Sequence, residues 1–68
     1  EEMYVINYAV PPALVLDARP DYLVVLEVYG RKSLFRDARF SAAYSLLAKL
    51  DTDIYGSDGM LIFRRNVP

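Results

Sequence analysis

The sequence contains no cysteine, no histidine, no tryptophan and no glutamine. Without cysteine the chain forms no disulfide, and without cysteine and histidine together it cannot build a zinc finger. A 68-residue chain buries only about 60% of the surface that its unfolded form exposes, so small domains usually rely on disulfides, a metal or oligomerisation. The sequence therefore predicts that oligomerisation supplies additional buried surface.

The net charge is small, and long hydrophobic runs are absent. The formal net charge is only −1, which produces no long-range field to attract a polyanion. The chain starts with two glutamates, lacks the hydrophobic region of a signal peptide, and has no apolar run near the roughly 20 residues that span a bilayer. We expect one cytoplasmic domain over residues 1–68 that does not enter a membrane. The scarcity of thermolabile side chains is typical of a thermophile.

Four runs of apolar and β-branched residues predict strands, at residues 3–10, 13–17, 22–29 and 60–65. Two consecutive prolines, Pro11 and Pro12, end the first run because proline cannot donate to a sheet ladder. The segment 18–21 contains Pro20 and reads as a turn, so the second and third runs predict an antiparallel hairpin.

One helix is predicted over residues 34–50, which contain neither glycine nor proline. Ser33 is placed to cap its first turn. A strand, a helix and a further strand in succession imply a crossover, which places strands 22–29 and 60–65 parallel to each other. The predicted fold class is α+β: a small two-layer domain with a three- or four-stranded mixed sheet and one helix, in the order ββ(β)αβ.

The strand at 22–29 is apolar on both faces, since side chains alternate along a strand. Such a strand is normally covered on both sides, whereas one helix covers only one side of the sheet. A bare second face would exceed the apolar patch that soluble monomers tolerate. We therefore predict that this face docks on a second copy, in a two-fold homodimer, or on another protein. The predicted interface residues are Tyr22, Val24, Leu26 and Val28.

A basic turn lies between the third predicted strand and the predicted helix. Arg31, Lys32 and Ser33 stand where free helix amides attract anions, and Arg36 lies one turn further on. This pattern indicates a site for the phosphate of a nucleic acid or of a small ligand. The alternative is a solvated turn with a capping serine, because the spacing of a Walker A loop is absent.

Tyrosines in the predicted strands favour a second functional hypothesis. Tyr4, Tyr8, Tyr22 and Tyr29 could stack on the bases of a single-stranded nucleic acid, as in proteins that read RNA on a sheet face. The aromatic-rich motif of those proteins is absent, and tyrosine is also common in strands and interfaces. Nucleic-acid binding through the basic turn and these tyrosines is therefore the alternative to protein assembly.

Three aspartates follow the predicted helix, namely Asp51, Asp53 and Asp58. The spacing of the first two, followed by Gly56, is similar to the start of a calcium-binding EF-hand loop. The loop lacks the bidentate glutamate, since Ile62 occupies that position, so an ordinary turn competes with a weak cation site.

Catalysis has little support in the sequence. Glu27 is expected to form a salt bridge with the Arg64–Arg65 pair in the neighbouring strand. The chain offers no second acid beside it and no nucleophile with an adjacent base. We expect a protein that is not an enzyme and uses no cofactor.

Overall fold

The computed structural model describes residues 1–67 and contains one four-stranded sheet with the strand order β1-β2-β4-β3. Strands β1 and β2 are parallel, whereas β4 runs antiparallel to both β2 and β3. This mixed sheet confirms the predicted α+β class. The strands are β1 (Met3–Ile6), β2 (Tyr22–Leu26), β3 (Tyr44–Leu50) and β4 (Met60–Arg65).

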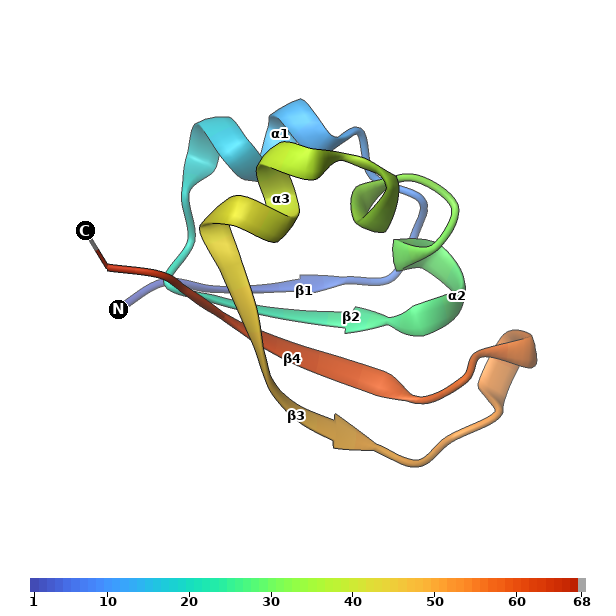
Figure 1. Cartoon of the computed structure of the whole chain (residues 1–68). Helices are drawn as coiled ribbons and strands as arrows, with labels where there is room; N and C mark the ends of the chain where they lie inside the picture. The colour runs from blue at the N-terminus through green and yellow to red at the C-terminus, as the bar shows by residue number, and fades with distance from the viewer. Residues whose placement is uncertain (68) are drawn as a thin grey trace.

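The helical segments are short, and the two main ones lie over one face of the sheet (Figure 1). Helix α1 connects the parallel strands β1 and β2, and α3 leads directly into β3. The prediction of a single long helix was therefore wrong. The helices are α1 (Pro12–Ala18), α2 (Glu27–Gly30) and α3 (Ala38–Ala43), with single 3₁₀ turns η1 (Leu34–Arg36) and η2 (Ile54–Gly56).

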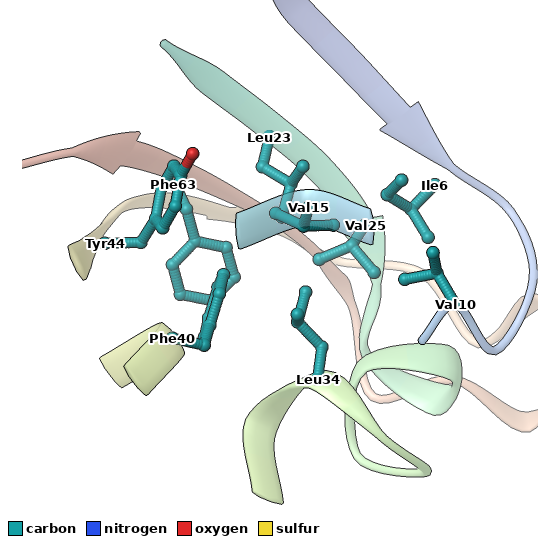
Figure 2. Close-up of a cluster of buried hydrophobic side chains, with 9 residues drawn as sticks. All are labelled: Ile6, Val10, Val15, Leu23, Val25, Leu34, Phe40, Tyr44 and Phe63. Atoms are coloured by element: carbon teal, nitrogen blue, oxygen red, sulfur yellow. The ribbon is translucent and has the colours of Figure 1, made fainter. Parts of the chain in front are cut away.

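The hydrophobic core fills the space between these helices and the sheet (Figure 2). Phe40 of α3 stacks on Tyr44, with ring centroids 5.2 Å apart, and meets Phe63 edge-on at 5.0 Å. The Tyr44 hydroxyl donates to the Pro20 carbonyl at 2.7 Å, so its polar end is satisfied inside the core. The buried cluster consists of Ile6, Val10, Val15, Leu23, Val25, Leu34, Phe40, Tyr44 and Phe63.

The predicted strand at 13–17 is helix α1, so no hairpin forms there. Pro12 is the first helical residue, where its fixed φ suits a helix and its missing N–H costs no hydrogen bond. The first strand also ends at Ile6 rather than at residue 10. The third predicted strand, 22–29, ends at Leu26, and residues 27–30 form the turn of helix α2.

The predicted helix at 34–50 is divided among three elements. Its true helical part is α3, capped by Asp37, whose carboxylate accepts from the Arg39 N–H. The second half forms β3, which pairs with β4 through a register irregularity between Leu46 and Ala48. Because β3 adds a strand between β2 and β4 in sequence, β4 returns antiparallel to β2, and the predicted parallel pairing was wrong.

Asp21 joins the starts of β1 and β2 to the end of β4. Its carboxylate accepts from the Glu2 N–H at 2.8 Å and from the Arg65 guanidinium at 2.9 Å. These two hydrogen bonds, that of Glu2 first, lower the pKa of the Asp21 carboxyl. The carboxylate therefore stabilises the fold at any pH above its ordinary pKa of about 3.9.

We expect the melting temperature to fall as the pH drops below about 4, because the lowered pKa of Asp21 makes its protonation unfavourable in the folded chain. Asp21→Asn should melt at a lower temperature near neutral pH and should lose less on acidification. Melting curves followed by circular dichroism between pH 2 and 7 measure both effects. The matched control is Asp17→Asn on α1, and an acid response of Asp21→Asn equal to that of the wild type would contradict the prediction.

Candidate interaction face

The outer face is the side of the sheet that points away from α1 and α3 (Figure 1). Directly paired residues of neighbouring strands share a face, and Leu23, Val25 and Phe63 point into the core. The alternate residues therefore form the outer face, in three rows across the strands. These rows are Met3–Tyr22–Arg64–Ser45, Val5–Val24–Ile62–Ala48 and, without β1, Leu26–Met60–Leu50.

The outer face is apolar and largely open to solvent. Met3, Val5 and Leu50 are 62%, 64% and 53% exposed, and the central Val24 and Ile62 are half-buried between neighbouring strands. Arg64 is the one charged residue in the three rows. An apolar surface that continues across four strands is the kind of patch that marks an interaction site.

The structure places only part of the predicted interface on this face. Tyr22 and Val24 lie on it and are half-buried, whereas Leu26 shares the register but is only 7% exposed. Val28 lies in α2, where it is buried and donates its N–H to the Ser57 hydroxyl. Val28 does not lie on the predicted face because β2 ends at Leu26.

Other members of the outer face were not in the predicted set. The alternation of residues 3–6 and 60–65 carries the signal for Met3, Val5, Met60 and Ile62. Ala48 and Leu50 gave no such signal, since their segment reads as a helix until its pairing with β4 is known.

The residues of the predicted anion site are engaged in other contacts. The Ser33 hydroxyl donates to the Val10 carbonyl at 2.7 Å and makes no cap contact. Arg31 pairs with Glu27 at 3.1 Å, and the Lys32 ammonium lies 5.9 Å from the centre of the Tyr29 ring. Arg36 is exposed at the end of η1.

Only the single 3₁₀ turn η1 begins after Ser33, and not the long α-helix assumed for this anion site. Helix α3 begins only after Asp37, and the hydrogen bonds to Arg39 lower the pKa of the Asp37 carboxyl. An anionic side chain therefore already occupies the cap position. The predicted start of a long helix at residue 34 was wrong, and Ser33 therefore does not precede an α-helix.

The aspartates of the predicted cation site do not gather into a ligand set. Asp58 pairs with Lys49 at 3.3 Å, while Asp51 and Asp53 are exposed in the loop before it. Within residues 1–67, no group of three or more acidic side chains is placed to hold a metal ion.

The fold separates the tyrosines that were predicted to stack on bases. Tyr4 and Tyr29 pack against the core, whereas Tyr22 lies on the outer face. Tyr8 follows the end of β1 and is in no strand. These rings do not form one stacking surface.

Glu27 pairs with Arg31 instead of Arg64 or Arg65, because the antiparallel register puts Arg64 opposite Tyr22.

Among the helices of the described residues, none is long and apolar enough to cross a bilayer. No known protein family, curated protein or solved structure matches this chain.

Proposed function

We propose that this chain is a small assembly subunit that self-associates by packing its outer face against that of a second copy. The observation that supports this proposal is the uncovered apolar surface across four strands, with Arg64 as its one charged residue. The proposal assigns the chain a structural role rather than catalysis.

The outer face alone is smaller than one side of a standard protein interface. Strand spacing of about 4.8 Å and a rise of about 3.4 Å per residue give it a flat footprint of about 400 Å². A standard protein interface buries about 800 Å² per partner. Projecting side chains add accessible area to the flat footprint and so reduce the difference between the two areas. Contacts beyond the outer face must supply the rest.

A second copy suits this surface better than a nucleic acid. Phosphate contacts supply most of the affinity for nucleic acids, and they require several cations, whereas the outer face carries only Arg64. Two copies related by a two-fold axis bring an apolar surface against the same apolar surface. Each copy then covers the sheet face that α1 and α3 of its partner leave open.

The test is the substitution Val5→Lys, which places a charge on the outer face. Val5 is 64% exposed at the edge strand β1, so the isolated fold tolerates lysine there. In the dimer the ammonium group would have to be desolvated against apolar side chains. We expect the dissociation constant of self-association to rise at least about ten-fold.

Sedimentation velocity over a range of protein concentrations measures this change. The matched control is Leu14→Lys, because Leu14 is 51% exposed on α1 and lies on the opposite side of the sheet. The control should associate like the wild type. A wild-type chain that stays monomeric up to millimolar concentration would refute the proposal, as would an equal effect of both lysines.

A further inference from the structure

The loop between β3 and β4, residues 51–59, presents an unusual aromatic tip. Tyr55 is 73% exposed and has φ = 55°, and Ile54 beside it is also exposed. A bulky residue in this left-handed region is rare, because its Cβ approaches the backbone carbonyl too closely. Such a conformation persists only where the surrounding structure fixes it.

Hydrogen bonds to α2 fix this loop. The buried Ser57 hydroxyl accepts from the Val28 N–H at 3.2 Å and donates to the Gly59 carbonyl at 2.6 Å. The Glu27 carboxylate accepts from the Asp58 N–H at 2.9 Å, and Arg31 donates to the Gly56 carbonyl at 3.2 Å. A preorganised loop binds with a smaller entropy loss, and tyrosine is among the residues enriched at interface hot spots.

A groove of about 360 Å³ lies at the other end of β3. Leu46 and Leu47 are exposed beside it, and Arg64 contributes a positive charge. Leu46 pairs with the buried Phe63 and therefore lies on the helix side of the sheet, where it stays exposed, whereas Ser45 and Arg64 lie on the outer face. The groove is thus lined from both sides of the β3 edge. The groove is lined by Ser45, Leu46, Leu47, Arg64, Arg65, Asn66 and Val67.

The loop and the groove are complementary in charge and in polarity. The loop combines the apolar pair Ile54 and Tyr55 with the exposed carboxylates of Asp51 and Asp53, and it contains no cation. The groove combines leucines with arginine. The two features lie at opposite ends of a seven-residue strand, about 20 Å apart. The loop of one chain therefore cannot fill the groove of that same chain.

We propose that, in the self-association described above, loop 51–59 of each copy seats in the groove of the other copy. This inference rests on the proposed function and adds the relative orientation of the copies. A two-fold axis that lies between the two sheets, at right angles to the direction of β3, brings each loop onto the other copy's groove, with the stacked strands antiparallel. The two reciprocal contacts supply the area that the outer face lacks, and they close the assembly at two copies.

Tyr55→Gly tests the loop contact without risk to the fold. Glycine adopts a φ of 55° without strain, so the isolated chain should be at least as stable as the wild type. Loss of the ring should nevertheless raise the dissociation constant of the dimer at least about ten-fold. The matched control is Tyr8→Ser, because Tyr8 is an exposed tyrosine outside the loop, and it should leave the constant unchanged.

A charge exchange tests the orientation. Arg64→Glu and Asp53→Arg should each weaken self-association, because like charges then meet at both contacts of the homodimer. An equimolar mixture of the two variants should form a heterodimer tighter than either homodimer, because both contacts become attractive again. Native mass spectrometry of the mixture separates the three species.

The two proposals fail in distinguishable ways. A wild-type dimer that Val5→Lys weakens, but that neither Tyr55→Gly nor the charge exchange affects, overturns the loop-in-groove arrangement and leaves the proposed function standing. A monomeric wild-type chain overturns both.

Discussion

Phe40→Ala is expected to leave the chain largely unfolded in water at room temperature. Phe40 is buried, and its ring contacts those of Phe35, Tyr44 and Phe63. Truncating a buried phenylalanine to alanine costs about 3–5 kcal/mol through lost burial and the cavity left behind. A domain of this size has a total stability of about 3–10 kcal/mol. The loss is therefore comparable to the whole free energy of unfolding.

Urea unfolding followed by far-ultraviolet circular dichroism measures this effect. Phe40→Leu is the control, because it keeps most of the apolar volume and loses only the ring contacts, and it should retain a cooperative transition. A loss below about 1 kcal/mol for Phe40→Ala would mean that Phe40 does not anchor the core.

Gly30→Ala is expected to destabilise the chain by about 1–3 kcal/mol. A Cβ at position 30 would lie 2.2 to 2.6 Å from three atoms of the Phe35 ring. That ring packs 5.4 Å from the Phe63 ring and 5.8 Å from that of Phe40, so it cannot shift without disturbing the core. Alanine gains up to about 1 kcal/mol over glycine in a helical position, and this gain is too small to offset the clash.

A double-mutant cycle isolates the cause of this loss. If the clash with the ring is responsible, Gly30→Ala should cost much less in a Phe35→Ala background. Gly56→Ala is a second control, because no atom lies near its Cβ and only its φ of 75° opposes the side chain. Equal costs of Gly30→Ala in both backgrounds would exclude the ring as the cause.

The strands whose identity depends on local pattern were predictable from the sequence. Residues 60–65 form β4 with the predicted bounds, and residues 22–26, the first five of the predicted third strand, form β2. The prediction that one side of the sheet has no helical cover rested on a single helix; the structure has several short helices, of which α1 and α3 lie over the same face (Figure 1). Because β-branched and apolar residues dominate both segments, local preference and tertiary structure agree there.

The segments with helix-forming residues were not predictable in this way. Residues 44–50 contain alanine, leucine and lysine, which favour a helix, yet they form a strand because β4 offers them an unpaired edge. That edge is contributed by residues ten or more positions further along the chain. In 13–17 the helix signal was present in Pro12, but proline also ends strands, and the two interpretations could not be separated locally.

The candidate interaction face likewise has a part that follows from local sequence pattern and a part that depends on tertiary structure. Alternation within single strands groups Met3 with Val5 and Tyr22 with Val24, but the register between β1 and β2 is needed to place both pairs on one face. The loop tip and the groove depend on the backbone conformation at Tyr55 and on the β3–β4 pairing. Neither can be read from residue types alone.

The strand order β1-β2-β4-β3 places β4, the last of the four strands in the chain, between two strands that are made before it. During translation, β2 and β3 therefore cannot be joined into one sheet until β4 has left the ribosome. Until then β3 lacks its pairing partner and the Phe63 side of the core is missing. The sheet can therefore be completed only after the β4 segment has been synthesised.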